Sequence, residues 1–154
     1  VGPVADYLGW GPLDQEGLAG VAALVEGLNK IYASAPAMWD DDYTGFEWID
    51  ASDGDHNLIS YLRKGSDDAG NREVVVCISN FAGNPHEGYR VGLPFGGEWV
   101  EILNTDSEEF GGSGVVNVGT IIAEDTPWNG RPVSASLRVP PLGAVWRVPA
   151  SQVR

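Results

Sequence analysis

Carboxylates are the side chains best suited by type to acid–base chemistry, and the sequence gathers many of them into three short clusters, at residues 40–42, 67–68 and 108–109. A catalytic pair of carboxylates must lie on opposite sides of the reacting bond and have separated pKa values. Neighbouring residues of a strand point to opposite faces, so a sequence doublet makes a poor pair. We therefore interpret the clusters as solvated loop charges and predict no catalytic residue in this chain.

A glycine-rich stretch, LNTDSEEFGGSGVVNVG at residues 103–119, could in principle bind phosphate or carry a nucleophile. A phosphate loop needs glycines that lead into a helix, usually with Lys and Ser or Thr. This stretch has no Lys and continues into β-branched residues. Ser113 stands in the wrong register for the nucleophile motif G-x-S-x-G. We therefore predict that the stretch is a connection in a β domain.

The sequence gives little support for a metal site or a cofactor site. Residues 50–57, DASDGDHN, lack the ligand rhythm of a calcium loop, and Asp53-Gly54 favours a hairpin turn. His56 and His86 have no Cys/His spacing that suggests zinc. Cys77, inside VVVCIS, is interpreted as a small buried hydrophobe. We predict no metal ligand and no cofactor.

The aromatic residues are more suggestive, because sugar rings stack on exposed aromatic faces. The chain has six Trp, of which Trp48, Trp99 and Trp146 lie within strand-like segments. We expect these three in the core. Trp128 lies in the loop EDTPWNGRP and is the best candidate for an exposed sugar contact.

The net charge of the chain limits the classes of molecule that it is expected to bind. The formal net charge is −13, from 22 Asp and Glu against 9 Lys and Arg. Such a surface repels phosphate backbones and anionic lipids, so we expect neither nucleic acid nor membrane as a partner. No apolar run is long enough to span a membrane, and the N-terminus has no signal-peptide pattern. One cysteine forms no internal disulfide, which fits a reducing cytoplasm.

One helix must help to position these residues. Apolar residues at three- and four-residue steps predict a helix over residues 14–34, with Asp14 as N-cap and Pro36 as the stop. Three glycines weaken it, each by about 1 kcal/mol relative to Ala. Its wide apolar face needs a neighbour, either the edge of a sheet or a helical layer absent from this chain. That face comprises Leu18, Val21, Leu24, Val25, Leu28, Ile31 and Tyr32.

From residue 46 onward the apolar period changes to two, which is the period of a strand. About seven short strands separated by turn residues predict a mainly β fold, an antiparallel β-sandwich. The run VVVCI, residues 74–78, is expected to be the most buried strand, because it leaves neither face for water. The change of period predicts a helical segment at 1–39 and an all-β domain at 40–154.

Two of the later strands carry a clear alternation. Residues 133–139, VSASLRV, predict that Val133, Ala135, Leu137 and Val139 point inward and that the residues between them point outward. The strand GAVWRV repeats the pattern, with Ala144, Trp146 and Val148 expected inward.

Three long segments carry a more specific pattern. They are LVEGLNKIYASAPAMWDDDYTGFEWIDASDGDHNLISYLRKG, SNFAGNPHEGYRVGLPFGGEWVEILNTDSEEFGGSG and ASLRVPPLGAVWRV. In this order they resemble the C-terminal end of bacterial 1,4-alpha-glucan branching enzymes, glycogen-forming members of the alpha-amylase superfamily. The resemblance covers nearly the whole chain, although Gly9 and Leu18 stand where the family pattern has a more polar Asp and His.

The resemblance implies a place in a larger enzyme. Enzymes of this family have a (β/α)8 barrel whose last helix leads into an all-β C-terminal domain, so residues 14–34 would be that helix. Their reaction cuts an α-1,4-glucan, holds it covalently and transfers it to a 6-hydroxyl with retention. Their catalytic Asp, Glu and second Asp lie at barrel strand ends, and none of those motifs occurs here. No residue of this chain inherits a catalytic role, and the chain alone is expected to be inactive.

The same resemblance implies the partners, which are the upstream catalytic barrel of the parent chain and an alpha-glucan, in the bacterial cytoplasm. It makes Trp128 a candidate for glucan contact. Residues 103–119 would be a long loop after an edge strand, in which Asn104 and Asp106 hydrogen-bond local backbone. The alternative is a free-standing carbohydrate-binding β module without catalysis, and an upstream reading frame that ends in barrel motifs would distinguish the two.

Overall fold

A computed structural model describes residues 16–41 and 43–153. In this part of the chain, helix α2 (Glu16–Ser34) and the short helix α3 (Pro36–Trp39) precede eight strands. The strands are β1 (Phe46–Asp50), β2 (Leu58–Ser66), β3 (Arg72–Asn80), β4 (His86–Leu93), β5 (Gly97–Asn104), β6 (Thr120–Ala123), β7 (Val133–Val139) and β8 (Ala144–Pro149). Single 3-10 turns occur at Tyr43–Gly45, Glu108–Phe110 (η2) and Ala150–Gln152.

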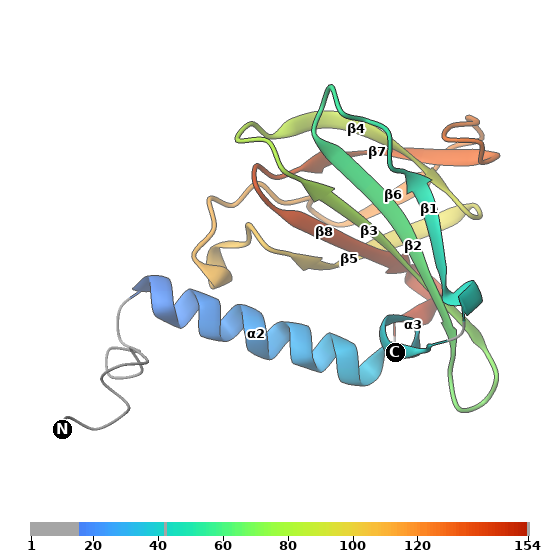
Figure 1. Cartoon of the computed structure of the whole chain (residues 1–154), viewed down its shortest axis with the longest axis horizontal. Coiled ribbons are helices and arrows are strands. Elements are labelled where there is room, and N and C mark those ends of the chain that lie inside the picture. Colours follow the sequence, from blue (N-terminus) through green and yellow to red (C-terminus); the bar gives the residue numbers. More distant parts are fainter. Residues whose placement is uncertain (1–15, 42, 154) are drawn as a thin grey trace.

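The strands form two antiparallel sheets that pack face to face (Figure 1). The larger sheet has the order β1-β2-β3-β8-β5-β6, and the smaller sheet pairs β4 with β7. The predicted antiparallel sandwich, mainly β and preceded by one long helix, is confirmed. The prediction of about seven strands missed β6, which has only four residues and alternates between exposed and half-buried positions. Because β6 pairs with β5, the expectation that β5 is an edge strand was wrong.

Strand β3 is the centre of the packing. Val76 and Ile78 lie in the cluster between the two sheets, and Val75 and Cys77 lie in a second cluster on the outer face of the larger sheet. All four are 0% exposed, which confirms the expected burial on both faces. Burial raises the pKa of the Cys77 thiol to about 12, against the opposing effect of a hydrogen bond with Tyr61. Cys77 therefore behaves as a small hydrophobe.

The outer cluster is closed by α3, which the sequence analysis did not predict. Ala37 of α3 is 0% exposed and packs with Val75, Cys77 and Val148. A Cβ added to Gly65 of β2 would lie 2.6 Å from the backbone N of Ala37, so the two backbones are in direct contact. Pro36 occupies the first turn of α3, where its missing N–H is harmless. The sequence therefore starts a new helix at the proline that ends the previous one.

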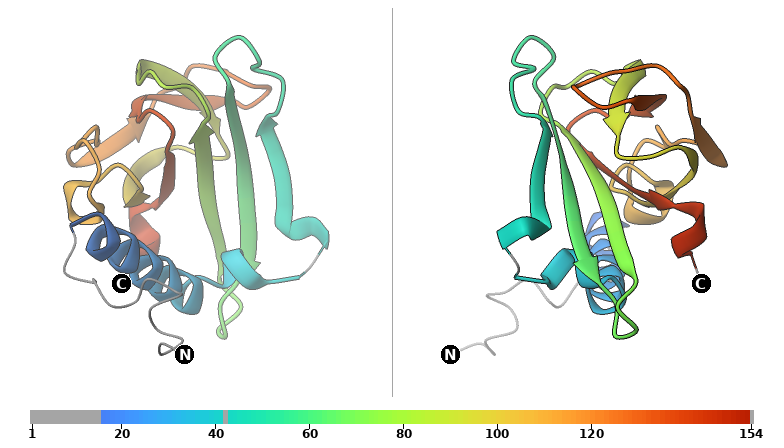
Figure 2. Two further views of the ribbon diagram at one scale, coloured as in Figure 1. Left: turned by 60° about the vertical axis from the view of Figure 1, so that its left-hand side comes forward. Right: turned by 90° about the vertical axis from the view of Figure 1, so that its right-hand side faces the viewer.

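Helix α2 ends at Ser34, as predicted, and runs along one end of the sandwich (Figure 2). The expected N-cap, Asp14, lies outside the described residues. Gly20 faces the 3-10 turn η2, where an added Cβ would lie 2.4 Å from the carbonyl O of Phe110. One glycine that weakens the helix is thus required for its close approach to a loop.

The opposite side of α2 carries a row that we call the apolar stripe: Leu18, Val21, Val25 and Tyr32. These side chains are 39% to 57% exposed. The predicted apolar face is therefore only partly covered, and its outer half has no partner among the residues that the structure describes.

The expected core position of the tryptophans is confirmed for Trp99, confirmed in part for Trp146, which packs against the outer cluster, and wrong for Trp48. Trp99 is 0% exposed, in the main core. Trp146 is half-buried, and Trp48 is 53% exposed. Trp48 lies on the outer face of the edge strand β1, where its ring contacts Phe46 and Tyr61 with centroid distances of 4.9 and 6.1 Å. Nothing in the described chain covers this face of the sheet beside β1. The alternation of the strand alone therefore predicted the wrong burial for Trp48.

Two polar residues of the late strands are buried against expectation. Ser134 was expected to point outward into solvent but is 0% exposed, because its hydroxyl donates to the Thr126 carbonyl and accepts from Arg90. In β8 the prediction of Ala144, Trp146 and Val148 as inward residues was wrong, because Trp146 and Val148 pack in the outer cluster instead. Val145 and Arg147 are the fully buried pair. Arg147 donates to the carbonyl O of Trp99 at 3.1 Å and to Glu101 at 3.2 Å, while its buried Nε has no hydrogen-bond partner among the described residues.

Replacing Val76 with Asp should unfold the β domain, because an unpaired carboxylate buried in the main core costs several kcal/mol. Ile122→Asp is the matched control, since Ile122 is 65% exposed on β6. Thermal unfolding followed by circular dichroism measures both. A Val76→Asp melting temperature equal to that of the parent chain would contradict the placement of β3.

Candidate functional site

The glycine-rich loop is held by one carboxylate. Asp106 accepts hydrogen bonds from the backbone N of Ser113 (2.9 Å), the Ser113 hydroxyl (2.7 Å) and the backbone N of Val115 (2.9 Å). Asn104 in turn accepts from the backbone N of Asp106 at 3.0 Å. Gly111 and Gly114 have positive φ, which lets the chain reverse. The prediction that Asn104 and Asp106 bind local backbone is confirmed, and the Ser113 hydroxyl is already used by Asp106.

The carboxylate of Asp106 is ionised in this setting. Burial raises its pKa, but the hydrogen bonds from Ser113 and Val115 together outweigh burial and hold the pKa below its ordinary value. The acidic clusters at residues 67–68 and 108–109 also lie outside the α-helices and strands. Asp67 accepts from the backbone N of Ala69 and Asn71 within its own turn, and Glu108 and Glu109 are exposed in η2.

Trp128 lies in a tight hairpin, residues 124–134, which we call the Trp128 hairpin. The backbones of Trp128 and Arg131 exchange hydrogen bonds of 3.0 and 2.9 Å. Asn129 and Gly130 between them have φ of 50° and 71°, as a type I′ turn requires. The Asn-Gly pair is a strong hairpin signal that the sequence analysis did not use. It explains why Trp128 stands at a defined position instead of in a loose loop.

Two side chains tie the Trp128 hairpin to the rest of the sandwich. Asn129 accepts from the backbone N of Gly92 in β4 (2.8 Å) and donates to Asp50 at the end of β1 (3.3 Å). Arg131 pairs with Glu47, which also pairs with Lys64 of β2. The hairpin is therefore fixed to both sheets.

A cleft of about 700 Å³ opens beside the hairpin, and we call it the Trp128 cleft. Three segments line it: the β1–β2 loop with the end of β1, the first half of β4, and the tip of the Trp128 hairpin. Trp128 is 48% exposed there, which confirms that it is an accessible tryptophan. Its contact with a glucan stays a prediction. The β1–β2 loop and the hairpin lie at the end of the sandwich away from α2 (Figures 1 and 2).

Asp53 organises the polar groups of the cleft. It faces Nδ1 of His56 at 2.6 Å and accepts from the Tyr89 hydroxyl at 3.2 Å. Burial raises the pKa of the Asp53 carboxyl, but His56 and Tyr89 together hold the pKa below its ordinary value. Burial also raises the pKa of Tyr89, and the neighbouring Asp53 carboxylate raises it further, so the phenol stays protonated. The ring of His86 contacts His56 edge-on at 5.4 Å.

Sequence reasoning found Trp128 but not the groups around it. Asp53 and His56 were interpreted only as turn residues, and Tyr89 was not considered. Nothing in the local pattern links the β1–β2 loop with β4, because those segments meet only through the packing of the two sheets.

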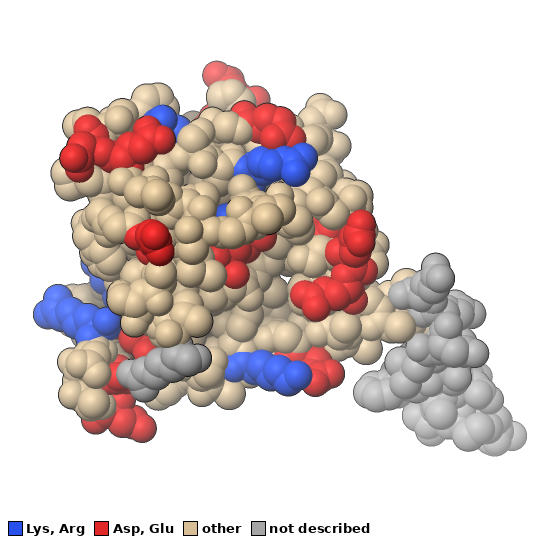
Figure 3. Space-filling view, turned by 180° about the vertical axis from the view of Figure 1, so that it is seen from behind, with Lys and Arg blue, Asp and Glu red and all other residues tan. Residues whose placement is uncertain are grey.

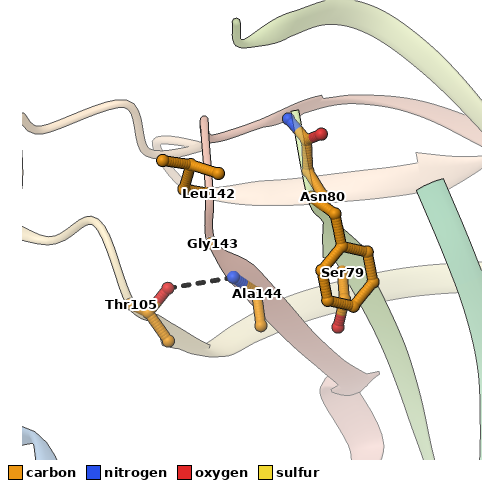
Figure 4. A pocket seen from close by; sticks show the side chains of 7 residues that line it. Ser79, Asn80, Thr105, Leu142, Gly143 and Ala144 are labelled. Atoms are coloured by element: carbon orange, nitrogen blue, oxygen red, sulfur yellow. Dashed lines mark hydrogen bonds between the residues drawn. The ribbon is translucent and has the colours of Figure 1, made fainter. Parts of the chain in front are cut away.

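Two other hollows offer less chemistry. One, of about 360 Å³, lies where β3 ends and β8 begins, and Figure 4 shows Leu142 and Thr105 on one side of it and Asn80 on the other. Its polar groups are engaged, since Thr105 accepts from the backbone N of Ala144 and Asn80 donates to the Pro140 carbonyl. The other, of about 740 Å³, surrounds Glu47 with its two cationic partners. Both are best explained as packing features.

The charged surface is mainly acidic, as the 22 Asp and Glu against 9 Lys and Arg of the sequence require. Figure 3 shows carboxylates spread over the back of the molecule, with basic side chains next to them in several places. In the described part of the chain, no three His, Cys, Asp or Glu side chains are arranged to hold a metal ion. None of its helices is long and apolar enough to cross a membrane.

Comparison with known proteins identifies the domain. Residues 48–150 match the family described as alpha amylase, C-terminal all-beta domain. The chain belongs to this family. The match begins within β1 and ends just after β8, so the alpha-amylase C-terminal domain includes the Trp128 cleft but not α2.

Longer similarities extend beyond the domain. The chain is 49% identical over 141 residues to the 1,4-alpha-glucan branching enzyme GlgB of Nocardia farcinica, with 90% of this chain and 18% of that protein covered. It is 50% identical over 146 residues to the GlgB of Frankia casuarinae (93% and 18%) and 47% identical to that of Mycobacterium tuberculosis (93% and 19%). The chain thus spans less than a fifth of the length of these relatives.

Asp106→Asn should lower stability at neutral pH by about 1–3 kcal/mol, because a carboxylate accepts the three hydrogen bonds better than an amide. A lowered folded-state pKa adds stability above the unfolded pKa of about 3.9, and this stability is lost as the pH falls through the folded pKa. Melting temperatures between pH 7 and 2 should therefore fall less steeply for Asp106→Asn. Asp68→Asn, an exposed loop carboxylate, is the control. Parallel pH profiles of the parent and Asp106→Asn would contradict this role.

Gly92→Ala should displace the Trp128 hairpin, because the added Cβ would lie 2.3 Å from the Trp128 carbonyl O. Overpacking of this kind costs about 1–3 kcal/mol. The NMR resonance of the Trp128 indole N–H should shift and the melting temperature should fall. Gly96→Ala is the control, since a Cβ there meets nothing within 4 Å. An unchanged indole resonance in Gly92→Ala would show that the contact does not fix the hairpin.

Proposed function

We propose that this chain is the C-terminal accessory portion of a bacterial glycogen branching enzyme. The parent enzyme would transfer α-1,4-glucan segments to 6-hydroxyls, forming α-1,6 branches with retention. The observation that carries the proposal is the high identity over 90–93% of this chain to proteins named 1,4-alpha-glucan branching enzyme, of which it covers only 18–19%. The remaining four-fifths of the parent enzyme would contain the catalytic residues.

The apolar stripe of α2 supports a catalytic partner in the same parent chain. Large apolar side chains exposed in a row are uncommon on a surface that faces only water. The family match begins at residue 48, after α2 and α3. We therefore assign residues 1–39 to the terminal helical segment of the catalytic barrel and residues 40–154 to the C-terminal domain. Burial of α3 against β2 and β3 would join the helical segment to the C-terminal domain.

The chemistry of the proposed reaction favours a site outside this chain. A retaining transfer needs a carboxylate nucleophile and a carboxylic acid about 5–5.5 Å apart, in a groove that orients donor and acceptor. The shielded carboxylates described above have structural partners: Asp53 faces His56 and Tyr89, and Asp106 holds its own loop. We propose that this portion covers one side of the barrel in the bacterial cytoplasm, and that the barrel supplies the catalytic groups.

The alternative of a free-standing carbohydrate-binding module gains no support from these comparisons, since the relatives are much longer proteins named as branching enzymes. An apolar stripe left in solvent also argues against it.

A branching assay tests the proposal. The purified 154 residues should leave amylose unbranched, whereas the longer protein that contains this sequence should form α-1,6 linkages and reduce iodine staining. One-dimensional proton NMR of the product detects the new linkages. The proposal fails if the longer protein is inactive on amylose, or if this chain alone forms α-1,6 linkages.

A further inference from the structure

We propose that the Trp128 cleft binds a linear α-glucan, with one glucosyl ring stacked on Trp128 and its hydroxyls hydrogen-bonded to His56 and Asp50. That the sugar is an α-glucan rests on the proposed function. That the ligand is a neutral polyhydroxylated molecule follows from the chemistry of the cleft.

Trp128 provides the stacking platform. Trp128 is 48% exposed and lines a cleft of about 700 Å³, a volume ordinary for small-molecule sites. The positive φ of Asn129 and Gly130 and the bonds from Asn129 to β1 and β4 fix the hairpin before any ligand arrives. A platform ordered in advance loses little conformational entropy on binding.

His56 provides a hydrogen-bonding group in a defined orientation. The ionised Asp53 carboxylate can only accept, so Nδ1 of His56 must carry the proton in their 2.6 Å contact. The other ring nitrogen, Nε2, is then left to hydrogen-bond with a sugar hydroxyl, which can donate or accept. The His56 side chain is 57% exposed, and the edge-on ring of His86 packs against it. The Nε2 atom of His56 is thus both fixed and accessible.

The remaining charged groups of the cleft already have partners. Arg90 pairs with Glu124 at 3.0 Å and Glu87 pairs with Arg138 at 2.9 Å. Asp50 accepts from the backbone N and hydroxyl of Ser52, at 2.8 and 2.9 Å, and can accept further from a sugar hydroxyl. A neutral ligand leaves these pairs intact, whereas an anion or cation would have to compete with them.

The position of the cleft suits an accessory site. The β1–β2 loop and the Trp128 hairpin, which line the cleft, lie at the end of the sandwich away from α2 (Figures 1 and 2). A catalytic domain that covers the apolar stripe would therefore leave the cleft free. A glucan held there would be retained near the enzyme without occupying the catalytic groove.

Titration of maltoheptaose into the 154-residue chain, followed by calorimetry and Trp fluorescence, tests the site. Trp128→Ala should weaken binding by about tenfold or more, and His56→Ala by about three- to tenfold. Trp48→Ala is the matched control, because Trp48 is equally exposed but lies on the outer face of the larger sheet. Its affinity should equal that of the parent chain, and melting temperatures should show that each variant is folded.

Equal affinity of Trp128→Ala and the parent chain, or no saturable binding by either, would overturn the site. Loss of binding in Trp48→Ala alone would also overturn it, because the ligand would then lie on the outer face. Cellohexaose binding as tightly as maltoheptaose would overturn the assignment to α-glucans. Failure of the proposed function is separate: a longer protein that does not branch amylose would leave Trp128-dependent binding by this chain unaffected.

Discussion

The burial of β3 on both faces is the constraint on which the rest of the structure depends. Val76 and Ile78 require the smaller sheet as a cover, and Val75 and Cys77 require a second cover on the outside. The residues Pro36–Trp39 supply part of that cover, with Ala37 buried completely. A sandwich of two sheets with no further cover has only one buried layer, which lies between the sheets. The helical segment is therefore joined to the β domain by packing, although sequence periodicity separates them near residue 40.

This arrangement gives the molecule two different ends. At one end, α2 rests on η2 through Gly20 and presents its apolar stripe outward. At the other end, the β1–β2 loop, β4 and the Trp128 hairpin surround a polar cleft with an exposed indole. The first end has the character of a protein interface and the second that of a sugar site. In a longer enzyme the two could be used at the same time.

The fold was largely predictable because its signals are local. The continuous run Val74 to Ile78 and the alternation in β7 follow directly from side-chain period. Burial was less predictable, since a period of two says which residues share a face but not which face is covered. Trp48 was misplaced for that reason, and Arg147 was missed because its partners, Trp99 and Glu101, lie on another strand. The candidate site was found only through Trp128, because Asp53, His56 and Tyr89 meet through tertiary packing.

The central claim is that this chain is one part of a branching enzyme whose remainder covers the apolar stripe of α2. The most direct test compares Val25→Lys in the 154-residue chain and in the longer protein. Val25 is 50% exposed here, so the substitution should change the free energy of unfolding of this chain by no more than about 0.5 kcal/mol. In the longer protein it should destabilise by about 2 kcal/mol or more, because a charge would enter an apolar interface. An equally small change in both proteins would contradict the account.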